Sequence, residues 1–148
     1  MKVHVSLKVA SLERSKAFYS KLFGQETSKA REDYANFRLD EPPIHLALME
    51  GEPACCSGLS HLGFELSDHG ALDDWRSRLE KAGVGFVPED EAACCYARAD
   101  KLWIGDPDGY RWEIWVRTGE HDAMGRAPVL EEIVRAENSA CCEQTACC

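Results

Sequence analysis

The chain has 148 residues, long enough for one well-cored domain or for two small modules that share a core. Its formal net charge is -9, from 17 basic and 26 acidic residues, which argues against nucleic acid or an anionic membrane as the main partner. The first residues lack the apolar run of a signal peptide, and no stretch approaches membrane-spanning length. We therefore expect a soluble, cytoplasmic protein.

The first half of the chain predicts one strand, one helix and three further strands. Apolar and polar residues alternate strictly from Val3 to Val9, which is typical of a half-buried strand. Ser11 is a plausible helix N-cap, apolar residues then recur at helical spacing to Phe23, and Gly24 follows where a helix commonly ends. The next expected strands are residues 26–31, the weakest of the three, 34–39 and 44–50.

The second half repeats this order after a Gly- and Pro-containing linker at residues 51–60. His61 aligns with His4 at an offset of 57 residues, and the strand that follows keeps this offset. A second amphipathic helix then carries Leu72, Trp75 and Leu79 on one stripe and closes at Gly83. Three strands are expected after it, at residues 85–88, 96–104 and 111–117, the last two joined by an Asp-Pro-Asp-Gly turn at 106–109.

This duplication predicts an α+β fold of two βαβββ modules that form one cupped mixed β-sheet around a metal site. The expected domain spans residues 1–118, with module one at 1–51 and module two at 59–118. Residues 119–148 form a C-terminal extension, in which residues 129–136 have the spacing of one short helix.

Two histidines and one carboxylate are the candidate metal ligands. If the first strand of each module pairs across the cup, His4 and His61 occupy equivalent places, and Glu113 lies on the face of its strand opposite Trp112, Ile114 and Val116. Two histidines and a carboxylate form the facial triad that leaves iron(II) open positions for oxygen and substrate. His45 leaves an alternative open. It could take the place that corresponds to Glu113 and give a four-ligand site, but aligning the turns puts Ala47 there instead.

Cysteine supplies a second kind of candidate site. The eight cysteines form four adjacent pairs: Cys55-Cys56, Cys94-Cys95, Cys141-Cys142 and Cys147-Cys148. Without a secretory signal this pattern indicates reduced thiols, and a disulfide between neighbouring residues is strained. Paired thiolates bind soft ions, although some pairs could be small buried hydrophobes. Tyr96, Arg98 and Lys101, which follow the pair Cys94-Cys95, are candidates for positioning or proton supply, with a surface position on a strand or loop as the alternative for each.

The elements HVSLKV, SHLGFEL and DPDGYRWEIW resemble the vicinal oxygen chelate superfamily, also called the glyoxalase/bleomycin-resistance/extradiol dioxygenase group. With YSKLFG, YANFRLDEPPIHLALME and CCYARADKLWIGDPDG added, the chain resembles one branch, the organoarsenical carbon-arsenic lyases, some of which are labelled cadmium-induced proteins. The resemblance covers about residues 2 to 118.

The resemblance implies iron(II) held by His4, His61 and Glu113, and a trivalent organoarsenical held by Cys94 and Cys95. It implies an Fe(II)- and O2-dependent cleavage of the carbon-arsenic bond that gives arsenite. It assigns no role to the other three cysteine pairs. Two alternatives stay open: a glyoxalase-type isomerase or thiol transferase, and a thiol-based binding protein for arsenic or cadmium.

Overall fold

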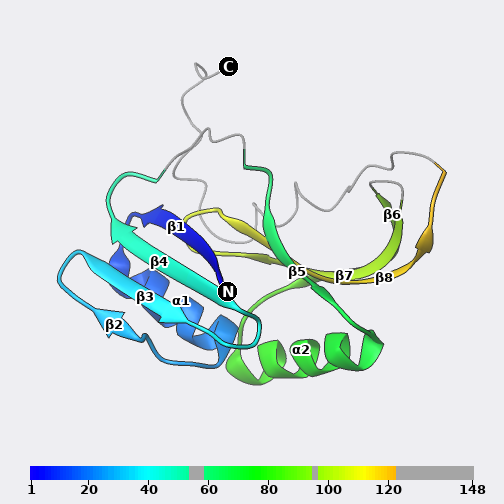
Figure 1. Cartoon of the computed structure of the whole chain (residues 1–148), viewed down its shortest axis with the longest axis horizontal. Coiled ribbons are helices and arrows are strands. Elements are labelled where there is room, and N and C mark those ends of the chain that lie inside the picture. Colours follow the sequence, from blue (N-terminus) through cyan, green and yellow to red (C-terminus); the bar gives the residue numbers. More distant parts are fainter. Residues whose placement is uncertain (54–58, 95–96, 123–148) are drawn as a thin grey trace, which may run out of the picture. The chain divides into compact units, whose positions relative to one another are not determined.

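The computed structural model of the chain describes residues 1–53, 59–94 and 97–122, with the side chain of Cys94 left out (Figure 1). The chain divides into two compact units. Unit 1 comprises Met1–Ser57 together with Asp106–Asp108, and unit 2 comprises Gly58–Gly105 and Gly109–Cys148. The following paragraphs treat the described residues of each unit separately.

Unit 1 contains one helix and one four-stranded sheet. Its elements are β1 (Val3–Val9), α1 (Leu12–Phe23), β2 (Lys29–Ala30), β3 (Tyr34–Arg38) and β4 (Ile44–Glu50). The strand order is β1-β4-β3-β2, in which β1 runs parallel to β4 and the other neighbours are antiparallel. The strand expected at residues 26–31 is only two residues long, because its polar side chains are mostly exposed and have no face to bury.

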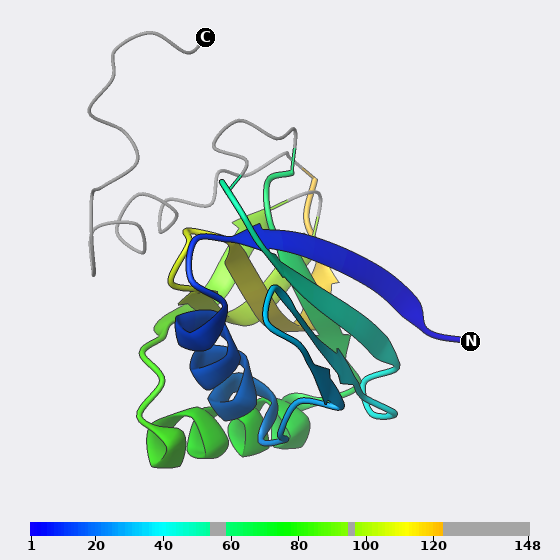
Figure 2. The same ribbon diagram turned by 90° about the vertical axis from the view of Figure 1, so that its left-hand side faces the viewer.

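Helix α1 begins and ends as its sequence predicts. The Ser11 side chain accepts a hydrogen bond from the Arg14 N–H, and Gly24 adopts the left-handed conformation with φ of 64°. The helix lies along one face of the sheet (Figure 2), where Tyr19, Phe23 and Phe37 form an aromatic cluster with ring centroids 5.7 to 6.3 Å apart. Tyr19 and Phe37 are fully buried, so this cluster is part of the unit 1 core.

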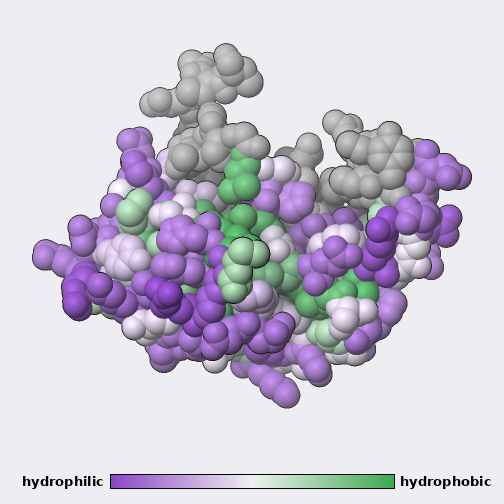
Figure 3. Space-filling model, viewed as in Figure 1, coloured by the Kyte–Doolittle hydropathy of each residue, from purple (hydrophilic) through white to green (hydrophobic). Residues whose placement is uncertain are grey.

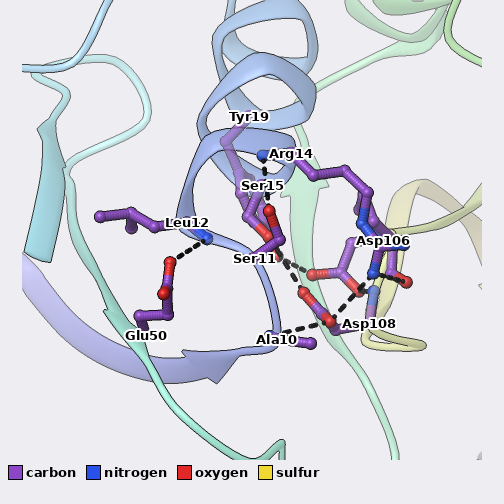
Figure 4. Close-up of polar contacts among 10 residues, drawn as sticks. Ala10, Ser11, Leu12, Arg14, Ser15, Tyr19, Glu50, Asp106 and Asp108 are labelled. Atoms are coloured by element: carbon purple, nitrogen blue, oxygen red, sulfur yellow. Dashed lines mark hydrogen bonds and ion pairs between the residues drawn. The ribbon is translucent and has the colours of Figure 1, made fainter. Parts of the chain in front are cut away.

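The turn at Asp106–Asp108 belongs to unit 1 and is held by side chains of α1 and by Ala10, which precedes the helix (Figure 4). The Tyr19 hydroxyl donates to Asp106 Oδ2 at 2.6 Å. Asp108 accepts hydrogen bonds from the Ala10 N–H at 3.1 Å and from the Ser15 hydroxyl at 3.0 Å. The two aspartates of this turn therefore anchor to α1 through long-range contacts, a role that the turn sequence alone did not indicate.

Unit 2 repeats the arrangement, with β5 (Leu62–Leu66), α2 (His69–Ala82), β6 (Val87–Cys94), β7 (Ala97–Gly105) and β8 (Arg111–Glu120). The strand order is β5-β8-β7-β6, and β5 runs parallel to β8. Asp68 caps α2 by accepting from the Ala71 N–H, and Gly83 ends the helix with φ of 66°. The matching order of the two four-stranded sheets confirms the predicted duplication of βαβββ modules.

Strand β6 differs most from the sequence prediction. It was expected to end at residue 88, but it continues to Cys94 and pairs with β7 over its whole length, except at an irregularity between Glu89 and Ala92. Its charged and small residues carry no alternating apolar pattern, so their pairing with β7 was not visible in the sequence. As a result, Cys94 ends a strand in the structure, and its backbone pairs with Ala97 at the start of β7.

On the face of the molecule that Figure 3 shows, hydrophilic residues predominate among the described side chains. Among the described residues, the large hydrophobic side chains that are exposed are Met1, Val3, Met49 and Leu59. None of the described helices is both long enough and apolar enough to cross a membrane.

Candidate functional site

Glu113 lies in the middle of β8, between two neighbouring strands. It is paired with Gly63 of β5 on one side and with Trp103 of β7 on the other. A Cβ atom at Gly63 would lie 2.3 Å from the Glu113 carbonyl oxygen, so only glycine allows β5 to approach β8 this closely. The carboxylate therefore extends from a densely packed part of the sheet.

Glu113 is buried, and its charge is paired with that of Lys101. The Lys101 Nζ donates to Glu113 Oε1 at 2.6 Å, and the two side chains are only 7% and 10% exposed. Lys101 is paired with Trp115, two residues beyond Glu113, so the two charged groups are diagonal neighbours on one face of the sheet. The sequence pattern placed Glu113 on the face away from the apolar core but did not predict its burial or its cationic partner.

His61 immediately precedes β5 and contacts the other carboxylate oxygen. Its Nε2 lies 3.3 Å from Glu113 Oε2, and its Nδ1 lies 3.0 Å from the Ser60 hydroxyl oxygen. The ring also packs edge-on against Trp103, with centroids 5.2 Å apart. Ser60 and Trp103 thus restrain the orientation of His61, as the second sphere of a metal site commonly does.

The spacing of these two donors fits one divalent metal ion. Adjacent ligands of an octahedral ion lie about 3.0 Å apart when each metal bond is about 2.1 Å long. The separation of 3.3 Å between His61 Nε2 and Glu113 Oε2 is close to this value. An imidazole nitrogen beside a carboxylate oxygen is also a donor pair that suits iron(II).

His4 lies in unit 1, on β1, where it contacts His45. These residues are paired across the parallel strands β1 and β4, and their Nδ1 atoms are 3.0 Å apart. Burial, followed by repulsion from His4, lowers the pKa of His45 below its ordinary value of 6.5. The His45 Nε2 atom is buried, and no described residue offers it a hydrogen-bond partner.

The pairing of strands decides which residue of unit 1 corresponds to Glu113. Gly63, the partner of Glu113, aligns with Ser6 at the offset between the modules, and Ser6 is paired with Ala47. The register that puts Ala47 in the equivalent place is therefore confirmed. His45 lies two residues earlier on β4, beside His4.

Strand β6, which ends in Cys94, is fixed by a contact that sequence analysis missed. Asp100 on β7 accepts a hydrogen bond from the Glu91 N–H at 2.7 Å and lies 2.8 Å from His69 Nε2 at the start of α2. Glu91 has a positive φ of 53° beside the irregularity in β6. The Glu91 hydrogen bond is the main reason that the pKa of Asp100 lies below its ordinary value of 3.8.

Several sequence predictions lie outside the described residues. These are the side chain of Cys94, the residues Cys95 and Tyr96, the pairs Cys55-Cys56, Cys141-Cys142 and Cys147-Cys148, and the helix expected at residues 129–136. Arg98 is described and is exposed on β7. Within either unit, the described side chains contain no group of three or more His, Cys, Asp and Glu residues that could hold a metal ion.

Known proteins resemble the chain over most of its length. Residues 3–114 match the model of the glyoxalase/bleomycin resistance protein/dioxygenase superfamily. A trivalent organoarsenical cleaving enzyme of Thermomonospora curvata is 40% identical over 141 residues, which are 95% of this chain and 87% of that protein. The cadmium-induced protein CadI of Mycobacterium tuberculosis is 34% identical over 142 residues, which are 96% of this chain and 93% of that protein.

A solved structure resembles the fold. The glyoxalase/bleomycin resistance protein/dioxygenase from Alicyclobacillus acidocaldarius has a TM-score of 0.64 and covers 80% of this chain and 92% of its own. Its sequence identity of 14% limits this likeness to the architecture. The glyoxalase-like α+β fold expected from the sequence is thereby confirmed.

Proposed function

The chain belongs to the glyoxalase/bleomycin resistance protein/dioxygenase superfamily, and we propose that it uses iron(II) and oxygen to cleave the carbon-arsenic bond of trivalent organoarsenicals. The observation that carries the proposal is the near full-length similarity to a trivalent organoarsenical cleaving enzyme, at 40% identity. The buried carboxylate of Glu113 facing His61 at 3.3 Å supports it from the structure.

We assign the iron(II) to His4, His61 and Glu113. In unit 2, the Glu113 carboxylate offers Oε2 toward His61, while Lys101 binds Oε1. His4, which aligns with His61 at the offset of 57 residues, would be the third ligand. Iron(II) bound by three protein ligands would leave open positions and would supply the chemistry that activates O2.

Cys94 and Cys95 bind the substrate in this proposal. Trivalent arsenic is soft and thiophilic, and a monosubstituted organoarsenical has two exchangeable positions beside its carbon. Two neighbouring thiolates can take both positions and leave the carbon-arsenic bond presented to the oxidant. Holding the arsenic at a fixed place makes a bimolecular step effectively unimolecular, and this effect of proximity can supply a large part of the rate acceleration.

The reaction balances with O2 as the only oxidant. Methylarsenite, CH3As(OH)2, and one O2 contain the atoms of arsenite, As(OH)3, and formaldehyde, HCHO. The carbon-arsenic bond is replaced by an arsenic-oxygen bond, the methyl carbon loses four electrons, and O2 accepts them. Arsenic remains trivalent, so no external reductant is required.

Variants at the two kinds of site test the assignment. Cys94→Ser and Cys95→Ser should each abolish arsenite release while keeping metal affinity, whereas Glu113→Ala should abolish release while keeping organoarsenical binding. Cys55→Ser, in a pair to which we assign no role, is the matched control. Arsenic speciation by chromatography and mass spectrometry measures release, and equilibrium dialysis measures binding. Turnover that survives in both Cys94 and Cys95 variants would contradict the assigned role.

A thiol-based binding protein is the second candidate, because a near full-length relative is named a cadmium-induced protein. Such a protein would need its cysteines but neither His61 nor Glu113. Tight binding of methylarsenite or cadmium without arsenite release would favour it. A glyoxalase-type isomerase is less well supported, because Ala47 occupies the place equivalent to Glu113 and cannot serve as a fourth ligand.

A further inference from the structure

Lys101 makes a contact that the proposed chemistry has not used. It is the charged partner of Glu113, and its side chain is only 7% exposed. Lysine is rarely buried to this extent unless its charge is compensated. Its 2.6 Å hydrogen bond to Glu113 Oε1 supplies that compensation. The neighbouring Arg98, on the same strand, is exposed instead.

The two oxygens of Glu113 face different partners. Oε1 accepts from Lys101, and Oε2 lies 3.3 Å from His61 Nε2. A carboxylate that is free to rotate exchanges its oxygens and can offer either one, or both, to a metal ion. Here one oxygen is already taken, so the carboxylate plane is fixed and a single oxygen remains on the His61 side.

Two tryptophan rings restrain Lys101 in turn. Its Nζ lies 5.7 Å from the centre of the Trp103 ring and 5.9 Å from that of Trp115, within the range of a cation-π contact. The Trp103 Nε1–H donates to Glu89 Oε2 at 2.9 Å, which fixes this ring. Trp103 also packs against His61. The ammonium and the imidazole therefore share one rigid neighbour.

We propose that Lys101 is a positioning residue for the metal site: it binds Glu113 Oε1 and thereby orients Oε2 toward the ion that His61 and Glu113 hold. This inference rests on the metal assignment of the proposed function. It predicts a change in metal affinity of the opposite sign to the change that a purely electrostatic role of Lys101 would give. Lys101 carries a positive charge close to a cation site, so by Coulomb's law its removal should tighten metal binding. If orientation dominates, its removal should weaken binding instead.

The test is a double-mutant cycle with cobalt(II) as a spectroscopic probe under anaerobic, reducing conditions. Lys101→Met should lower the cobalt affinity about 10- to 100-fold, the usual loss when a group that orients a metal ligand is removed. The same substitution in a Glu113→Ala background should not weaken the affinity, because the orienting contact is already absent and only the repulsion between the lysine charge and the metal ion is removed. Lys81 is an exposed lysine at the end of α2, so Lys81→Met is the matched control. Its cobalt affinity should equal that of the wild type.

Thermal unfolding without metal confirms that each variant is folded. Lys101→Leu, which is also apolar and has no N–H donor, replaces the methionine variant in the cycle if that variant does not fold. Unchanged or tighter cobalt binding by a folded Lys101 variant would overturn the inference, and so would an equal loss in the Glu113→Ala background. Absence of cobalt binding by the wild type would overturn it together with the metal assignment. Wild-type arsenite release is scored separately, so failure of the Lys101 inference and failure of the proposed function remain distinguishable.

Discussion

Gly63 offers a direct test of how the sheet of unit 2 places Glu113. In a Gly63→Ala variant, the added methyl carbon would lie 2.3 Å from the Glu113 carbonyl oxygen and 3.1 Å from the Glu113 Cβ. The closest comfortable approach of a carbon to a carbonyl oxygen is about 3.3 Å. The strands must therefore separate by about 1 Å. Both clashing atoms are held in the strand, so rotation of a side chain cannot relieve the contact.

A separation of this size stretches hydrogen bonds between β5 and β8 from about 2.9 Å to about 3.9 Å, beyond the useful range. Overpacking of this kind costs about 1–3 kcal/mol in free energy of unfolding. In a chain of this size we expect the melting temperature to fall by about 3–10 °C. Differential scanning fluorimetry and urea unfolding measure the effect.

Gly119→Ala is the matched control for Gly63→Ala. Gly119 lies on β8, the strand that pairs with the strand of Gly63, but a Cβ atom there would meet nothing within 4 Å. We expect the control to change the free energy of unfolding by less than about 1 kcal/mol in either direction. A Gly63→Ala variant as stable as the wild type would refute the close approach of β5 and β8 from which this prediction is derived.

The further predictions concern two hydrogen bonds, an exposed one to Asp100 and a buried one to Asp106. Asp100→Ala removes the partner of the Glu91 N–H, so the Glu91 amide should exchange its hydrogen faster in hydrogen-exchange mass spectrometry, while unchanged exchange would contradict the assigned contact. The folded-state pKa of Asp100 is lowered, so its contribution to stability is present above the unfolded value of about 3.8 and is lost as the pH falls through the folded pKa. The stability difference between wild type and Asp100→Ala should therefore shrink below about pH 4 in urea titrations, and a difference that grows there would contradict the sign. Tyr19→Phe removes a 2.6 Å hydrogen bond to the buried Asp106 carboxylate and should lower the free energy of unfolding by about 1.5–3 kcal/mol; a loss below about 0.5 kcal/mol would show that this bond does not hold the turn.

Local sequence patterns predicted much of the fold because the physical causes were local. The alternation in β1 gave its boundaries, and Ser11 and Gly24 gave the ends of α1. Matching the two turns predicted the correct register of β4, with Ala47 in the place of Glu113. The superfamily could also be recognised from the sequence, because its motifs lie in these regular elements.

The surroundings of the candidate site were harder to predict from the sequence because they depend on pairing between distant strands. Alternation shows which face Glu113 occupies, but not that Lys101 reaches it diagonally from β7 and is buried with it. The length of β6 depends on pairing with β7 in the same way. The contact of His69 with Asp100 joins α2 to β7, two elements that are far apart in the sequence. No single-residue propensity contains such information.

The central claim is that the protein breaks the carbon-arsenic bond and requires both iron(II) and O2 to do so. The most direct test is arsenite release from methylarsenite by reduced protein, with iron(II) or with a chelator, in air and under anaerobic conditions, with O2 uptake recorded alongside. The account predicts release only when iron(II) and O2 are both present, with one O2 consumed for each arsenite formed. Release under anaerobic conditions or with the chelator, or methylarsenite that is bound tightly and never cleaved, would contradict it.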